Sequence, residues 1–461
     1  MDKARKRMRS RQRRTRSLGI KLKMTCCILA VVLLVGGNAF ASGGGQAGNT
    51  LQEERQGFFV QRTLTDCIGY AALTAASEKA SAAFSEKEPQ AGDEPEAASG
   101  DTQLAPAVKP EVTLVMVGDI LLHTRVAESG ELEEGGYDFS AVFAWMKEEI
   151  SSADLALVNQ EVILGGADLG VSGYPAFNAP FELGEALEDA GFDVVLHATN
   201  HALDKGKKGI VNCLAFWEEH PDLAVLGIHG SRESQEEIYI CEKEGIRIAI
   251  LNYTYGTNGV ALPKDMPYAV DMLEKARVEA DLKRAEELAD FVIVCPHWGT
   301  EYTLEATREQ RKWAKLFAEN GADLVLGTHP HVLEPVEWVS AQADGEEGEE
   351  ATSQDTLVYY SLGNFVNWTS GTGAGVANRM VGGMAKVTIG LDETGEAVIR
   401  EYAVEPLVCH VEQGFGGVTV YPLKAYTQEL AARNEIASQD GSFSLEYCKD
   451  LVEKVLGGTA E

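Results

Sequence analysis

Residues that can bind metals or transfer protons follow the ends of five predicted strands. The strands are 112–117, 154–158, 193–197, 291–295 and 323–326. The polar residues that follow them are, in chain order, Asp119 with His123, Asn159 with Glu161, Asn200 with His201 and Asp204, His297 with Glu301, and His329 with His331. In an open α/β sheet, the carboxyl ends of parallel strands lie along one edge, where ligands bind. We therefore expect these residues to converge on one site although they lie far apart in the sequence.

The residue types in this set suit a transition-metal centre. Carboxylates combined with neutral imidazoles favour manganese, iron or zinc, whereas an all-oxygen set would favour magnesium or calcium. Two such ions about 3.5–4 Å apart can clamp a phosphoryl group and activate water at neutral pH. A histidine that does not bind the metal could protonate the leaving oxygen. The sequence therefore predicts one or two divalent cations and hydrolytic chemistry.

Each of these residues also has an ordinary structural explanation when it is taken alone. An aspartate after glycine at a strand end, such as Asp119, is usually part of a turn or a helix cap, and Asn159 could have the same role. His201 could be a loop histidine with satisfied hydrogen bonds. His329 and His331, which flank one proline, are harder to explain in this way. A site is indicated because residues of these types follow all five predicted strands in order along the chain.

The elements that must position these residues alternate along the chain. Helices are expected at 139–150, 181–190, 205–219, 271–289 and 305–320, with a further strand at 246–252. This alternation implies right-handed crossovers and a largely parallel sheet. Four later strands without intervening helices, 335–339, 356–361, 383–389 and 397–404, suggest a second, more antiparallel sheet packed on the first. The segment 341–354 is expected to be an acidic loop, and helices are expected near 423–433 and 444–455.

The first 110 residues have a different composition. Residues 1–23 contain eleven Lys or Arg and one Asp, and residues 24–41 are mostly apolar and end in Ala39-Phe40-Ala41, which fits a signal-peptidase site. A basic flank before an apolar stretch is typical of a signal sequence or a membrane anchor whose basic side stays in the cytoplasm. We expect 1–23 to be cytoplasmic, 24–41 to be a single-pass anchor, and the rest to be extracytoplasmic, or secreted if cleavage follows Ala41. Residues 42–110, rich in Ala, Glu, Gly, Ser and Pro, predict a disordered stalk.

The charge of the chain excludes one class of partner. The formal net charge is −31, and the residues after 23 carry 29 basic and 70 acidic side chains. Such a surface repels the phosphate backbone, so nucleic acid is not expected as a partner. An anionic polymer would need bound cations or a local basic patch to approach. The cysteines form no CxxC pair, so no zinc knuckle or redox motif is predicted.

Six segments, taken in order, resemble the signature of the CapA family of poly-gamma-glutamate capsule synthesis proteins. They are 117–121, 159–161, 198–204, 297–302, 327–332 and 360–365. The resemblance covers about 111–410 and leaves 411–461 as a C-terminal helical extension. It implies an α/β fold, a four-layer α/β/β/α sandwich of the calcineurin-like metallophosphatase type with mixed sheets. It also implies a role in the synthesis, export or anchoring of poly-gamma-glutamate at the cell envelope.

The resemblance also implies roles for single residues. The implied metal ligands are Asp119, Glu161, Asn200, His297, His329 and His331, the catalytic pair is His201 with Asp204, and the substrate-binding residues are Asn159, Glu301 and Asn364. Either Glu161 or Asn159 stands where metallophosphatases place a bridging aspartate. The chain departs from the pattern of typical metallophosphatases at residue 121, where Leu replaces the histidine of Asp-x-His. This departure affects one metal position, and Glu301 is an additional carboxylate that could compensate.

Three functions remain open at the level of sequence. One is a metal-dependent hydrolase or transferase that acts on a phosphoester, or on an amide or ester of a polymer, and the intact Asn200-His201 and His329/His331 motifs favour it. Another is a non-catalytic polymer-binding or scaffolding subunit of an envelope synthase complex, favoured by the altered motifs. The third is a glycosidase that uses Glu161 and Glu301 as paired carboxylates. The expected partners are an anionic envelope polymer (poly-gamma-glutamate) or synthase subunits.

Overall fold

The computed structural model describes residues 110–341 and 355–460. The predicted basic segment 1–23, the anchor 24–41, nearly all of the stalk 42–110 and the loop 341–354 apart from its first residue lie outside the described residues. None of the helices in the described ranges has the length and apolar character needed to span a bilayer.

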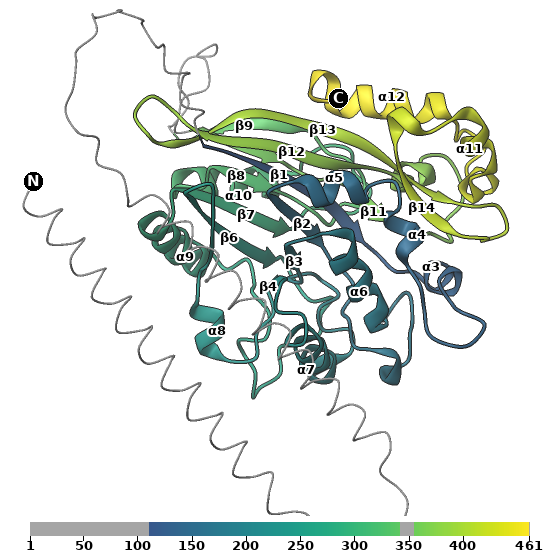
Figure 1. The fold of residues 1–461 in the computed structure, drawn as a ribbon, viewed down its shortest axis with the longest axis horizontal. Coiled ribbons are helices and arrows are strands. Elements are labelled where there is room, and N and C mark those ends of the chain that lie inside the picture. The colour runs from purple at the N-terminus through teal and green to yellow at the C-terminus, as the bar shows by residue number, and fades with distance from the viewer. Residues whose placement is uncertain (1–109, 342–354, 461) are drawn as a thin grey trace, which may run out of the picture. The chain divides into compact units, whose positions relative to one another are not determined.

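Two mixed β-sheets form the centre of the described chain (Figure 1). Sheet 1 contains β1 (Glu111–Ile120), β2 (Leu155–Asn159), β3 (Val194–Leu196), β4 (Ala224–Leu226), β11 (Asn364–Val366), β12 (Val381–Leu391), β13 (Ala397–Val411) and β14 (Val418–Pro422). Its strand order is β14-β13-β12-β1-β2-β3-β4, with β11 also paired to β1. Sheet 2 contains β5 (Tyr239–Lys243), β6 (Ile246–Thr254), β7 (Phe291–His297), β8 (Leu324–Leu326), β9 (Val336–Ser340) and β10 (Asp355–Tyr359). Its order is β5-β6-β7-β8-β10-β9.

The helices lie mostly in the crossovers between these strands. They are α3 (Thr124–Ser129), α4 (Ser140–Phe143), α5 (Lys147–Ser152), α6 (Phe181–Ala190), α7 (Gly206–Trp217), α8 (Arg232–Glu236), α9 (Lys275–Leu288), α10 (Arg308–Glu319), α11 (Gln428–Arg433) and α12 (Leu445–Leu456). Short 3₁₀ turns are η1 (Ala167–Leu169), η2 (Val376–Met380), η3 (Leu423–Ala425), η4 (Glu435–Ser438) and η5 (Gly457–Thr459).

The alternation of side chains along sheet 2 shows how the layers stack. In β6, Ile248 and Ile250 belong to the large core that includes sheet 1, whereas Ala249 and Leu251 belong to a second core with α9 and α10. Successive side chains of a strand point to opposite faces, so sheet 2 lies between sheet 1 and these helices. Helices α4 to α7 bury their apolar residues in the large core with sheet 1. The layers are therefore helices, sheet 1, sheet 2 and helices, and the predicted α/β class with two mixed sheets is confirmed.

The distribution of strands between the sheets differs from the sequence-based expectation. The parallel strands do not share one sheet: β1, β2 and β3 lie in sheet 1, whereas β6, β7 and β8 lie in sheet 2. The late strands extend both sheets instead of forming one of their own. The predicted helix 139–150 is divided into α4 and α5, and the predicted boundary at residue 410 falls inside β13. A strand buried on both faces has the same hydrophobic pattern whichever sheet it joins, so periodicity does not identify its partner.

An aspartate directly before each of four strands ties that strand to its neighbour. The carboxylates of Asp154, Asp193, Asp290 and Asp323 accept backbone N–H groups of Thr113 (2.8 Å), Ala156 (2.8 Å), Arg247 (3.0 Å) and Val292 (2.7 Å), respectively. In each case the aspartate precedes one strand, and the N–H donor lies in the neighbouring strand that pairs with it. The carboxylate therefore satisfies a backbone group at the start of the parallel ladder and helps to fix its register.

Two of these aspartates should affect stability with opposite dependence on pH. Burial raises the pKa of Asp323 to about 7, so its contribution to stability is complete at low pH and is lost as the pH rises through about 7. The N–H of Thr113 lowers the pKa of Asp154, so its contribution is present at neutral pH and is lost on acidification. We expect Asp323→Asn to flatten the decline in unfolding free energy between about pH 5 and about pH 8 by ~1–3 kcal/mol, while Asp154→Asn weakens the protein at neutral pH. Urea unfolding of the full-length chain across this range measures both, and parallel curves for Asp323→Asn and wild type would contradict the assignment.

Candidate metal centre

The end of β1 places Asp119 between two asparagines of neighbouring strands. In the parallel pairing, Asp119 aligns with Asn159 of β2 and with Asn364 of β11. Gly118 makes this possible, because an added Cβ there would lie only 1.9 Å from the carbonyl oxygen of Gly363. Asn159 Nδ2 donates to Asp119 Oδ1 at 2.8 Å. The sheet register therefore holds the Asp119 carboxylate in one orientation.

Glu161, two residues after β2, is completely buried, and neither of its carboxylate oxygens has a hydrogen-bond partner in the described structure. Imidazole nitrogens of His297 and His331 each lie 3.7 Å from this carboxylate, and Nε2 of His201 lies 3.9 Å from it. Burial raises the pKa of Glu161 well above its ordinary value. A buried carboxylate without donors is costly unless a cation or a proton compensates it.

The histidine pair after β8 adopts a strained backbone. His329 has φ 98° and His331 has φ 61°, both in the left-handed region that non-glycine residues rarely occupy. Such conformations cost about 1–3 kcal/mol each and persist where the surrounding structure fixes them. The His329 N–H points at Asp119 Oδ2 (3.2 Å), and His331 Nδ1 lies 3.1 Å from both Asp119 Oδ2 and Asn364 Oδ1. Nδ1 of His329 is buried without a partner in the part of the chain that the structure describes.

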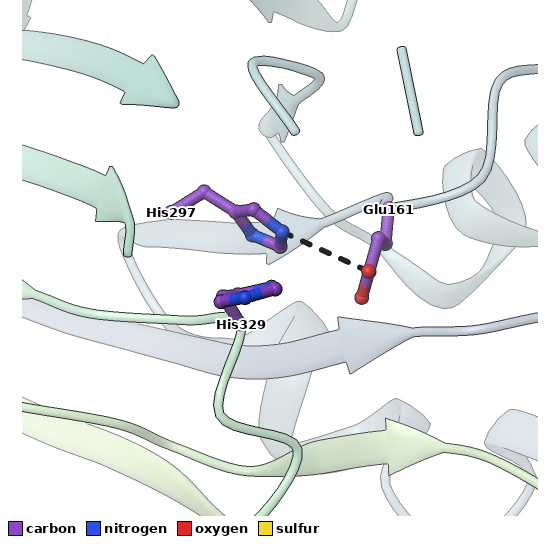
Figure 2. A group of neighbouring side chains, drawn as sticks. All are labelled: Glu161, His297 and His329. Atoms are coloured by element: carbon purple, nitrogen blue, oxygen red, sulfur yellow. Dashed lines mark ion pairs between the residues drawn. The ribbon is translucent and has the colours of Figure 1, made fainter. Parts of the chain in front are cut away.

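These side chains form three overlapping groups suited to a cation. In each group the ligand atoms all lie within 4.8 Å of one another; the groups are Glu161, His297 and His329 (Figure 2); Asp119, Glu161 and His331; and Glu301, His329 and His331. Figure 2 shows the first group pointing toward one another from three separate segments. Glu161, His329 and His331 each belong to two groups, and both carboxylate oxygens of Glu161 and Nδ1 of His329 lack hydrogen-bond partners among the described residues. The residues present therefore fit one or two metal ions.

The protonation states of the histidines agree with this chemistry. Burial lowers the pKa of His297 and of His329 well below its ordinary value, so both rings are neutral, the form that binds metals. Burial alone would also lower the pKa of His331, but the carboxylates of Glu161 and Asp119 raise it to about 9. In the absence of a cation, His331 therefore carries a proton that a bound metal would displace.

His297 is oriented by its neighbours. Its Nδ1 lies 3.0 Å from the Thr328 hydroxyl and its Nε2 lies 2.9 Å from Asn200 Oδ1. Asn200, predicted as a metal ligand, thus contacts His297 through the same oxygen that would bind a metal. Asn159 and Asn364, predicted to bind substrate, are buried and contact Asp119 and His331 instead of open space. Glu301 is exposed at the edge of the site.

A second, polar pair lies beside the Glu161 carboxylate. His201 Nδ1 is 2.7 Å from Asp204 Oδ2, and the same oxygen accepts the Phe177 N–H at 2.7 Å. A proton on Nδ1 shared with Asp204 leaves Nε2, the atom that faces Glu161, free to exchange a proton. Asn258 Nδ2 lies 3.3 Å from the same ring and its Oδ1 accepts from Asn200 Nδ2 at 3.3 Å. The predicted catalytic pair is therefore assembled next to the metal-ligating groups.

The remaining histidines outside this region have ordinary partners. His197 accepts from Trp217 Nε1 (3.0 Å), and His220, His229 and His410 contact Glu188, Asp271 and Tyr426, at 2.7, 2.6 and 3.0 Å. His123, which follows the strand that carries Asp119, belongs to none of the three groups but lies near the site: it packs edge-on against Phe177 with ring centroids 5.0 Å apart and lines the same cavity as His331. At residue 121, where typical metallophosphatases have the histidine of Asp-x-His, this chain has a leucine whose side chain is buried.

Several residues around the site have no sequence motif. They include Asn258, Asn367 and Arg379, which come from irregular or short segments. Arg379 is a basic residue that follows a glycine-rich stretch in a strongly acidic chain. Its positive charge in this setting is the one sequence signal that could have indicated a functional role.

A family model matches this chain at residues 113–369, more than half of its length; the model is described as "Bacterial capsule synthesis protein PGA_cap". The matched range contains every residue of the three groups.

Two curated relatives match with substantial identity. The chain is 32% identical over 190 residues to the "PGA biosynthesis protein CapA" of Bacillus subtilis (strain 168), covering 40% of this chain and 46% of the relative. It is 29% identical over 276 residues to the "Capsule biosynthesis protein CapA" of Bacillus anthracis, covering 56% of this chain and 61% of the relative. The matched regions thus span less than two thirds of either relative.

Solved structures with a similar fold include two nucleotidases. A 5′-nucleotidase precursor from Thermus thermophilus has a TM-score of 0.39 and 15% identity, over 65% of this chain and 54% of that chain. The NAD nucleotidase of Haemophilus influenzae has a TM-score of 0.39 and 15% identity, over 65% and 58% of the two chains. At these TM-scores the similarity carries no conclusion about activity.

Proposed function

The chain belongs to the bacterial capsule synthesis protein PGA_cap family, and from this premise we propose that it acts in the biosynthesis of poly-gamma-glutamate or a related capsule polymer at the cell envelope. The names of the two relatives, which refer to PGA and to capsule biosynthesis, support this proposal. We place the domain outside the cell membrane, either anchored through residues 24–41 or released after Ala41. N-terminal sequencing of the membrane-bound and secreted protein distinguishes these two states.

The chemistry proposed for the site is metal-dependent hydrolysis or group transfer. The observation that carries it is the buried Glu161 carboxylate, which has no hydrogen-bond donor among the described residues and faces three imidazoles. Manganese, iron or zinc suits this mixture of carboxylate and imidazole. Asp119, Glu161, His297, His329, His331 and Glu301 would hold one or two such ions. When bound, the ion would polarise a phosphoryl or carbonyl oxygen of the substrate.

The chain's own side chains would divide the remaining work. His201, oriented through Nδ1 by Asp204, would give a proton from Nε2 to the leaving group. Asn159 and Asn364 would hold Asp119 and His331 in position through their hydrogen bonds. Asn200 would do the same for His297, or bind the metal directly.

A second candidate function is non-catalytic binding of the polymer or scaffolding of a synthase complex. One observation favours it: at residue 121 a buried leucine occupies the position of a metal-binding histidine. A site with fewer ligands can still bind an ion and an anionic polymer without turning it over.

Metal analysis of the full-length purified chain tests whether the site holds an ion, and turnover of a generic phosphodiester by the metal-bound chain then separates the hydrolase from the binding or scaffolding role. We expect one or two equivalents of manganese, iron or zinc, and we expect their loss from the His329→Ala/His331→Ala double variant, since this variant removes ligands from all three groups. The His220→Ala/His229→Ala variant removes two histidines that pair with carboxylates elsewhere and should keep the metal. A wild-type chain that binds none of these ions after reconstitution would exclude metal-dependent chemistry and leave the binding or scaffolding role.

A further inference from the structure

A cavity of about 250 Å³ lies beside the metal-ligating residues. His331 forms part of its wall, together with Arg379, Asn367, Trp368, Thr369 and Tyr302. The cavity is thus contiguous with the proposed reaction site but has its own set of polar groups. None of the roles assigned above uses them.

Arg379 is the one lysine or arginine that lines this cavity, and none of the ion pairs among the described residues includes it. Its guanidinium carbon lies 3.5 Å from the centre of the Tyr302 ring, and Nη1 donates to Thr369 Oγ1 at 2.8 Å. Stacking and one hydrogen bond therefore fix the plane of the guanidinium while other N–H groups remain available. In a chain with a formal net charge of −31, this half-buried arginine has no carboxylate partner among the described residues.

A second donor in the same cavity also lacks a partner. Asn367 is 2% exposed, and its Nδ2 is buried without an acceptor in the described structure. Buried donors without partners are rare because each costs about 1–3 kcal/mol. Arg379 and Asn367 together provide a cation and a neutral donor for which the described part of the protein supplies no anion.

The segment that carries Arg379 is fixed relative to the metal site. Asn364 Nδ2 donates to the Arg379 carbonyl oxygen at 2.9 Å, and Asn364 Oδ1 lies 3.1 Å from His331 Nδ1. One asparagine thus connects the backbone of Arg379 to a metal-site histidine. This connection keeps the cavity at a constant distance from the reacting centre.

The C-terminal segment supports η2 from the other side. Asp440 Oδ2 accepts the N–H groups of Gly375 (2.8 Å) and Ala377 (3.3 Å), and the Tyr447 hydroxyl donates to Asn378 Oδ1 at 2.5 Å. These contacts give residues 411–461, for which the sequence offered no role, a positioning function for the cavity wall.

We propose that this cavity binds a carboxylate of the substrate, one carried by the residue next to the reacting group, so that the site takes chains that bear a carboxylate on each residue. The proposal rests on the proposed function and names the substrate class of the same site. A guanidinium offers two parallel N–H donors that match a carboxylate. Trp368 and Tyr302 offer apolar surfaces for the methylene groups between carboxylates, and Arg379 is the local basic group that an anionic polymer needs to approach this acidic protein.

The test is equilibrium binding of a fluorescently labelled γ-linked pentaglutamate to the full-length chain, followed by fluorescence anisotropy with and without bound metal. We expect Arg379→Gln to raise Kd about 10- to 100-fold, since a hydrogen-bonded charge pair is lost, and Arg379→Lys to cause a smaller increase. Metal content should not change in either variant. Arg125→Gln is the matched control, because Arg125 pairs with Glu128 at the surface and its loss changes the net charge equally.

Two further probes identify the anion. A pentamer whose side carboxylates are amidated should bind wild type weakly and should not distinguish wild type from Arg379→Gln. Equal Kd values for wild type and Arg379→Gln, or no binding of pentaglutamate by wild type, would overturn the proposal. Displacement of the probe by inorganic phosphate that is lost in Arg379→Gln would assign the cavity to phosphate instead. Because the metal-free arm reports on the cavity alone, absence of metal would count against the proposed function and not against this carboxylate site.

Discussion

Replacing Glu161 by glutamine should make the metal-free protein more stable and should abolish most of its stabilisation by metal. In the wild type, the carboxylate is buried without a donor among the described residues, and its raised pKa means that its contribution to stability is lost as the pH rises through that folded-state pKa. A neutral amide avoids this cost, so the metal-free variant should gain about 1–3 kcal/mol near neutral pH. Wild type should gain about 3–4 kcal/mol from a metal present at 100 to 1,000 times its Kd. Glu161→Gln should lose most of that gain, because Glu161 belongs to two of the three groups.

Urea unfolding of the full-length chain, with and without excess Mn²⁺, measures both effects. Glu334→Gln provides a matched control: Glu334 is also buried and burial raises its pKa to about 8, but its oxygens accept hydrogen bonds from Gln310 (2.5 Å) and Thr303 (3.3 Å). Glu334 lies in none of the three groups, so this variant should keep the metal-dependent gain. If Glu161→Gln keeps that gain as well, Glu161 is not a metal ligand.

Replacing His201 by glutamine should lower kcat by about 10²- to 10⁴-fold without changing the metal content. His201 is held by Asp204 and directs Nε2 toward the site, but it belongs to none of the three groups. The loss should be large for a phosphodiester with an alkoxide leaving group, which needs a proton, and small for one with a nitrophenolate leaving group, which does not. Asp204→Asn should show the same pattern with a smaller loss, because the ring would lose its orienting partner but keep its position.

Single-turnover rates for the two substrates, together with metal analysis, check this prediction. His220→Gln is the control, since His220 pairs with Glu188 away from the site. Equal losses for both leaving groups would show that His201 acts in binding or positioning and not as a proton donor. Loss of metal from His201→Gln would show that the ring belongs to the metal centre itself.

Local pattern determined the type and position of most elements. The buried runs of β1, β2 and β7 and the helix α6 fall where their periodicity places them, because a strand or helix must expose its polar face and bury its apolar one. The sequence also located the polar residues at the carboxyl ends of strands, although these strands belong to two different sheets and not to one. The sequence alone therefore indicates Asp119, Glu161, His297, His329 and His331 as candidate metal ligands.

Pairing between distant strands was decided only by the tertiary structure. Nothing in the hydrophobic pattern of β2 or β6 specifies which sheet each joins, because both are buried on both faces. The predicted helix 139–150 is divided into α4 and α5 in the structure. Local helix preference did not indicate this division, because tertiary packing can outweigh such preference.

The division of labour within the site was likewise decided by the fold. The strand register sets Asn159 and Asn364 on either side of Asp119, where Asn159 became a partner of Asp119 and Asn364 a partner of His331. Arg379 became part of the cavity beside His331 through one hydrogen bond from Asn364 and support from the C-terminal segment. Sequence by itself determines which side chains can do chemistry, whereas their partners depend on contacts between segments far apart in the chain, and no local pattern encodes such contacts.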